Sequence, residues 1–215
     1  MSVISPSTAA PPPTRRSEIL EAATELFAAS GYRGTTIAAV ARRVGMTDAG
    51  VLHHFRTKES LLLGVLQEYG RTVEAQIEHA GARGVDLLHL VRHWGVGMER
   101  RPEISALLIT LTTEHLTDDS PVRRALQAAY RQGLDRYIAA FATAAARGDL
   151  RSDLDPVHEA SAMIAHLDGI RLQWFLSDGG FSMADSVRRY VDDTLERLAP
   201  THDRPTTSGA DRPWP

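Results

Sequence analysis

Residues 47–53 combine side chains that can contact duplex DNA: a hydroxyl on Thr47, a carboxylate on Asp48, small residues at Ala49 and Gly50, and an imidazole on His53. A short hydroxyl and a helix N-terminus can hold a phosphate, and side chains in the first helical turns can reach base edges. The small residues would let a helix approach the groove closely. The carboxylate can accept a hydrogen bond from a cytosine amino group, or it can simply stabilise a helix N-terminus, which is the interpretation that we favour.

The elements that must position these residues are two short helices separated by a tight turn. Apolar residues recur at helical spacing from Ile37 to Val44, so the first helix has one apolar face. Gly45 can take the left-handed conformation of a C-terminal cap, and Thr47 is a suitable N-cap for the second helix. Two helices joined by a short turn with glycine form a helix-turn-helix, whose second helix enters the major groove of DNA.

The sequence from Arg16 to Leu62 resembles the N-terminal domain of the TetR family of transcriptional regulators. The resemblance is carried by the apolar helix at 16–30, by the Gly-Met-Thr turn at 45–47, and by the run His-His-Phe-Arg-Thr-Lys-Glu-Ser-Leu-Leu at 53–62, all in the family's order. It implies an all-helical homodimer that represses promoters at a palindromic operator. It also implies that a small-molecule effector binds the C-terminal domain and releases the DNA; activation in place of repression stays open.

The resemblance also implies roles for single residues. Thr36 and Lys58 would hold phosphates on either side of the motif, and His53 and His54 would lie near the DNA backbone. The family usually has a tyrosine where this chain has Leu52, and that tyrosine commonly contacts a phosphate. Leucine cannot make this contact.

Charge supports a local DNA-binding surface. The chain of 215 residues has a net charge of −3, but residues 14–58 contain seven basic and four acidic side chains. This segment therefore carries +3, which a dimer would double, and the remainder carries −6. Phosphate affinity depends on the local patch and not on the total charge. The acidic remainder argues against nucleic acid wrapped over the whole surface.

Composition also limits the class of protein. No apolar run approaches the roughly 18 residues of a membrane span, and the N-terminus lacks the apolar segment of a secretory signal. Cysteine is absent, which excludes disulfides and thiolate metal sites. We therefore expect a cytoplasmic protein without membrane contact.

Along the chain we expect about nine helices and no strand, which gives an all-α fold. A disordered N-terminal arm at 1–13 would precede the DNA-binding domain at 14–58. A helical bundle for ligand binding and dimerisation would follow at 59–199, with a disordered tail at 200–215. Beyond the helix-turn-helix, the predicted helices lie at 15–30, 58–77, 85–100, 103–116, 121–147, 156–177 and 182–198.

The helix expected at 156–177 is apolar on more than one side, so it needs two packing partners. We expect it and the helix at 182–198 to form a four-helix dimer interface; the alternative is a central core helix within one subunit. The expected interface residues are Met163, Leu167, Ile170, Trp174, Val191 and Leu195.

An effector pocket is expected inside the C-terminal bundle, because bundle interiors are common ligand sites. The mixture of aromatic and occasional polar side chains favours a mainly apolar effector, and most of the candidates are expected to be core residues. The candidates are Trp94, Met98, Leu107, Leu111, Glu114, Tyr130, Tyr137, His166 and Trp174.

Catalysis has little support in the sequence. His89 and His93 share a helix face, but no third metal ligand stands at a readable spacing, so we expect no metal, no cofactor and no enzyme. Two alternatives remain: a helical ligand carrier or enzyme on a related scaffold without DNA binding, and a helix-turn-helix that binds only protein partners.

Overall fold

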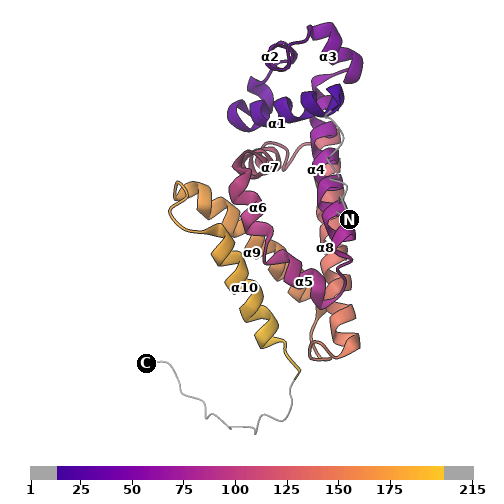
Figure 1. Cartoon of the computed structure of the whole chain (residues 1–215), viewed down its shortest axis with the longest axis vertical. Coiled ribbons are helices and arrows are strands. Elements are labelled where there is room, and N and C mark those ends of the chain that lie inside the picture. Colours follow the sequence, from indigo (N-terminus) through magenta and orange to yellow (C-terminus); the bar gives the residue numbers. More distant parts are fainter. Residues whose placement is uncertain (1–13, 201–215) are drawn as a thin grey trace, which may run out of the picture. The chain divides into compact units, whose positions relative to one another are not determined.

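The structure, a computed structural model, describes residues 14–200. The predicted arm at 1–13 and all but the first residue of the predicted tail lie outside the described residues. The described part is entirely helical, which confirms the all-α fold (Figure 1). Its helices are α1 (Arg15–Gly34), α2 (Ile37–Arg43), α3 (Asp48–His54), α4 (Lys58–Ala80), α5 (Val85–Val91), α6 (Trp94–Arg100), α7 (Pro102–Glu114), α8 (Pro121–Arg147), α9 (Pro156–Leu176) and α10 (Met183–Arg197).

The helices begin where short polar side chains satisfy free backbone N–H groups. Thr14, Asp155 and Ser182 accept hydrogen bonds from the first turns of α1, α9 and α10. The Ser120 hydroxyl accepts from the Arg123 N–H at the start of α8, and the Thr57 hydroxyl accepts from the Ser60 N–H at the start of α4. The predicted helices at 58–77, 121–147, 156–177 and 182–198 thus begin within one residue of their expected starts.

One predicted helix is divided in two, so residues 14–200 contain ten helices where about nine were expected. The segment 85–100 forms α5 and α6, because the N–H groups of Arg92 and His93 bond to the carbonyls three residues back. Residues at this break pack against α10. Arg92 forms an ion pair with Asp192 at 2.8 Å, and a Cβ on Gly95 would lie 2.7 Å from the Ala184 Cα.

The described residues form two compact units, each made of two separate segments of the chain. The first contains residues 14–79 and 97–131, and the second contains residues 80–96 and 132–200. The first unit thus adds α7 and the start of α8 to α1–α4. This differs from the predicted division at 58/59, which followed the order of motifs along the chain.

The first unit has a continuous apolar core around α1. Phe27 on α1 is fully buried in a cluster with Val51 of α3, Leu61 of α4 and Leu111 of α7. Figure 1 shows α1 between the α2–α3 pair and α7. The DNA-binding segment therefore shares its core with a helix that the sequence assigned to the ligand-binding half.

The second unit is held by apolar packing of α9 and α10 and by one buried ion pair. Arg197 donates from both terminal nitrogens to Glu159, at 2.9 and 2.7 Å, and the carboxylate is almost fully buried. The hydrogen bonds from Arg197 lower the pKa of Glu159. This pair joins α9 to the end of α10.

The close contact of α4 with α3 depends on Gly64. A Cβ there would lie 2.7 Å from Phe55 Cε1 and 3.1 Å from Leu20 Cδ2. We expect Gly64→Ala to lower the free energy of unfolding by about 1–3 kcal/mol, because the ring must move in a packed core. Gly70→Ala on the same helix meets open space and should raise stability by roughly 0.5–1 kcal/mol through helix propensity. Urea denaturation measures both, and equal effects at the two positions would contradict the account.

Candidate nucleic-acid interface

The orientation of α3 is set by its two buried side chains. Val51 is fully buried and Phe55 is 4 % exposed, so both lie in the core of the first unit. The Arg16 guanidinium covers the Phe55 ring at 5.0 Å. The opposite side of α3, with Asp48, Ala49 and His53, is therefore exposed.

The turn before α3 has the predicted geometry. Gly45 has φ +65°, and the Met46 N–H bonds to the Ala41 carbonyl at 2.9 Å, which closes the end of α2. The Gly50 N–H bonds to the Thr47 hydroxyl at 3.1 Å. The helix-turn-helix is thus built from local hydrogen bonds, and Thr47 is its second N-cap.

The predicted DNA-binding residues gather around this motif, and several of them also make contacts within the protein. Thr36 caps α2 through its hydroxyl, which accepts from the Ala39 N–H at 3.1 Å. The exposed His53 and His54 rings lie 5.7 Å apart, edge to face. Gly50 is half-buried, and a Cβ there would lie 3.0 Å from Met46 Cε, so its small size serves the turn itself.

Lys58, a phosphate clamp by resemblance, contacts the protein backbone. Its ammonium donates to the carbonyls of Tyr32 and Thr35 at 2.9 and 3.0 Å and lies 4.4 Å from the centre of the Tyr32 ring. These carbonyls belong to the end of α1 and its C-cap. Lys58 thus fixes the α1–α2 connection directly before Thr36.

Basic side chains also surround the far end of α3. An open cavity of about 380 Å³ lies beside Phe55, and Arg16, His54 and Arg56 contribute to its lining. Arg16 was not among the residues predicted to contact DNA, although the positive charge of residues 14–58 was a signal for it. Arg43 pairs with Glu25, so this arginine is partly neutralised.

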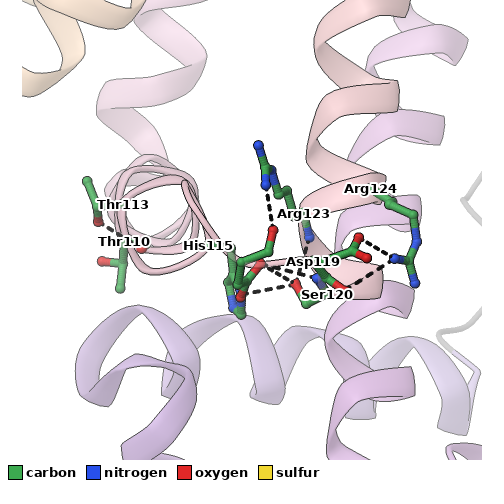
Figure 2. A network of polar contacts seen from close by, with 8 residues as sticks. Thr110, Thr113, His115, Asp119, Ser120, Arg123 and Arg124 are labelled. Atoms are coloured by element: carbon green, nitrogen blue, oxygen red, sulfur yellow. Dashed lines mark hydrogen bonds and ion pairs between the residues drawn. The ribbon is translucent and has the colours of Figure 1, made fainter.

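The α7–α8 connection contacts α1 at the same place as Lys58. His115 Nδ1 lies 2.5 Å from Asp118 Oδ2 and 3.2 Å from the Ser120 hydroxyl, and Arg123 donates to the Asp118 carbonyl (Figure 2). The hydrogen bond to His115 is the main cause of the lowered pKa of Asp118. The His115 ring meets the Tyr32 ring edge to face at 6.1 Å.

These residues do not have the arrangement of a catalytic triad. In a triad the serine and the carboxylate contact opposite nitrogens of the histidine. Here Ser120 and Asp118 both contact Nδ1, and the Ser120 hydroxyl caps α8. The cluster therefore stabilises a connection between helices.

The predicted pocket residues are divided between the two units. In the first unit Met98, Leu107 and Leu111 are buried, whereas Glu114 and Tyr130 are exposed. In the second unit the remaining four, Trp94, Tyr137, His166 and Trp174, are half-buried. The pocket stays a prediction.

His166 is the polar candidate with the most defined surroundings. Its ring stacks on Tyr190 at 3.8 Å, and burial lowers the pKa of His166. A lowered pKa favours the neutral imidazole, which can donate one hydrogen bond and accept another.

The predicted dimer residues differ in how far their side chains are exposed. Met163, Leu167 and Val191 are buried within one subunit, whereas Ile170, Trp174 and Leu195 are half-buried. Leu172 and Leu176 belong to the apolar residues of this helix but were not among the expected interface residues, and both are exposed on α9. Their apolar type was visible, but the side of the helix that packs inward was not.

Neither a membrane-spanning helix nor a cluster of metal ligands is found among residues 14–200. No helix there is both long and apolar enough to cross a bilayer. The same residues contain no group of three metal-ligating side chains, and His89 and His93 are both exposed.

The geometry defines a helical protein with an exposed helix-turn-helix, and comparisons with known proteins give the family. Residues 19–65 match the bacterial regulatory proteins of the tetR family, and residues 86–200 match the C-terminal domain of BetI-type transcriptional repressors. The chain therefore belongs to the TetR family of DNA-binding transcriptional regulators.

Individual relatives agree with this assignment. The chain is 26% identical to the HTH-type transcriptional regulator TtgR of Pseudomonas putida over 192 residues, which cover 85% of this chain and 90% of TtgR. SmeT, the repressor of the Stenotrophomonas maltophilia multidrug efflux pump SmeDEF, has a TM-score of 0.72 at 21% identity, with 93% and 98% of the two chains covered. A transcriptional regulator from Saccharomonospora viridis in complex with choline has a TM-score of 0.72 at 23% identity, with 84% and 95% covered.

The contacts of Lys58 give a prediction that separates a structural from a phosphate-binding role. Lys58→Met should lower the free energy of unfolding by about 1–3 kcal/mol, because two carbonyls lose a charged donor. The slope of log Kd against log salt, measured with a DNA fragment selected by the protein, should change by less than the roughly 0.9 expected for each lost phosphate contact.

Arg56→Met is the matched control. This arginine is exposed two residues earlier, so its loss should leave stability unchanged and reduce the salt slope. If Lys58→Met instead kept the stability of the protein and reduced the slope, Lys58 would be a phosphate clamp.

Proposed function

We propose that this protein is a homodimeric repressor that binds a palindromic operator through α3 and leaves it when a small-molecule effector binds. The observation that carries the proposal is the exposed outer face of α3, whose rotation is fixed by the buried Val51 and Phe55. One α3 per subunit would enter successive major grooves, with half-site centres about 34 Å apart.

The contacts with DNA divide by chemistry. Asp48 and Ala49 lie in the first turn of α3, where side chains reach base edges. His53, His54, Arg16 and Arg56 supply imidazole and guanidinium groups for phosphates around the helix. Thr47 accepts the Gly50 N–H, and its hydroxyl hydrogen can still be donated to a phosphate.

The dimer would form through the exposed apolar side of α9 together with α10. Leu172 and Leu176 are 45% and 78% exposed and stand four residues apart, so they lie on one side of the helix. Leu195 of α10 is half-buried and can widen this surface, whereas Trp174 lies on the opposite side of α9, with the buried Met163 and Leu167. A second copy would remove these side chains from water, which is the main driving force of such association.

The effector would act by binding the DNA-incompetent state more tightly than the competent one. Solved relatives are described with choline and with stearoyl-CoA, so the fold accepts chemically different ligands. In this chain a movement of α7 would be transmitted to the DNA-binding helices, because Leu107 and Leu111 lie in the same core as the buried residues of α1. The α7–α8 connection adds the contact of the His115 ring with the ring of Tyr32, and the Tyr32 carbonyl accepts a hydrogen bond from Lys58.

Ala49→Glu tests DNA binding at the outer face of α3. The added carboxylate should weaken binding roughly a hundredfold, because it places negative charge against the DNA. The measurement is a gel-shift titration with a fragment that the full-length protein selects from random duplexes. Ala75→Glu, an equally exposed change on α4, should leave Kd unchanged. Equal affinity of the two variants, or no salt-sensitive selection by the unchanged protein, would count against the proposal.

Leu172→Glu tests the dimer surface. The protein should become monomeric in sedimentation experiments, because a carboxylate would be buried without a partner at the interface. The affinity of the protein for the full palindrome should fall when the dimer is lost. Leu116→Glu, on the α7–α8 connection, makes the same change at an exposed leucine outside α9 and should keep the dimer. A dimeric Leu172→Glu protein would place the interface elsewhere.

A further inference from the structure

Leu52 on α3 is an exposed apolar side chain that the core does not need. Its side chain is 40% exposed. Every other large apolar side chain among residues 14–95 is more deeply buried than that of Leu52. Val51 and Phe55 already occupy the inward positions of this short helix. Leu52 is an apolar side chain exposed to water at the centre of the proposed DNA contact surface. Contact with an apolar group of the DNA would remove it from water.

The position of Leu52 places it beside the residues expected to reach base edges. It stands four residues after Asp48 and three after Ala49, so the three share one side of the helix. Side chains on a helix lean towards its N-terminus. Leu52 therefore covers the surface next to the first turn of α3, the part of a recognition helix that enters the groove.

The composition of α3 restricts what this surface can read. The helix contains no arginine, lysine, asparagine or glutamine, so the usual two-bond contacts to guanine and adenine are not available from it. The contacts that stay available include a hydrogen bond from a cytosine amino group to Asp48, a hydrogen bond of the Thr47 hydroxyl, and an apolar contact with the methyl group of thymine. Of these, a leucine can make only the apolar contact. Leucine has no donor for a phosphate.

We propose that Leu52 packs against the C5-methyl group of one thymine in each half-site and thereby determines specificity at that base pair. The inference rests on the proposed DNA-binding function and adds the base that this side chain recognises. Its energetic source is removal of the leucine side chain and the methyl group from water. The contact involves no charge.

The experiment removes the methyl group without changing base pairing. The full-length protein first selects its site from random duplexes, and each thymine of that site is then replaced in turn by deoxyuridine. We expect one symmetric pair of replacements, made together, to raise Kd by about fifteenfold, because burial of one methyl group contributes roughly fourfold in each half-site. Leu52→Ala should bind the thymine and deoxyuridine sites equally.

Two controls make the result specific. Leu116→Ala shortens another exposed leucine and should keep the full preference for thymine. The salt slope of Leu52→Ala should match that of the unchanged protein, because no phosphate contact is lost. An unchanged thermal unfolding midpoint shows that Leu52→Ala keeps its fold, as expected for a side chain outside the core.

The outcomes separate the inference from the function beneath it. If the unchanged protein selects no DNA, the proposed function fails and the inference fails with it. If it binds a site in a salt-sensitive way, the function stands. The inference is then overturned when every deoxyuridine site binds as well as thymine, or when Leu52→Ala retains the preference. A Leu52→Ala protein that keeps its DNA affinity but loses a protein partner would also overturn it.

Discussion

The DNA-facing surface of this protein depends on the burial of Val51 and Phe55. A seven-residue helix has too few internal hydrogen bonds to be stable alone, so tertiary packing must hold α3 in place. Phe55 fills the space that Gly64 leaves on α4, and Arg16 covers the other side of the ring. Each exposed residue of α3 points where it does because these two side chains point inward.

Local features were predictable from the sequence, because their interactions lie within a few residues. The caps at Thr36, Thr47 and Ser182 each require one hydrogen bond to a neighbour three residues away. The division between α5 and α6 was not predictable. Arg92, at this division, forms an ion pair with Asp192, which lies 100 residues further along the chain. The position of α7 in the first unit was missed for the same physical reason.

Functional roles carried over from a resemblance depend on partners that residue types do not reveal. Lysine at position 58 is compatible with a phosphate, but its ammonium is within hydrogen-bonding distance of the Tyr32 and Thr35 carbonyls. Leucine at position 52 loses the phosphate contact of the family's tyrosine. The structure adds what the sequence could not: this leucine is exposed, beside Asp48 and Ala49. A departure from the family pattern can thus replace one kind of recognition by another.

The core shared by α1 and α7 restricts how a signal can reach the DNA. A packed core resists continuous deformation, so a shift of α7 must move α1 or break contacts with Phe27 and its neighbours. The end of α1 is held by Lys58, and Tyr32 there also meets His115 of the α7–α8 connection. Movement of α1 would then displace Thr36, the N-cap of α2, and with it the turn that leads to α3. The effector that we propose would therefore need to change only the placement of α7 to misalign α3.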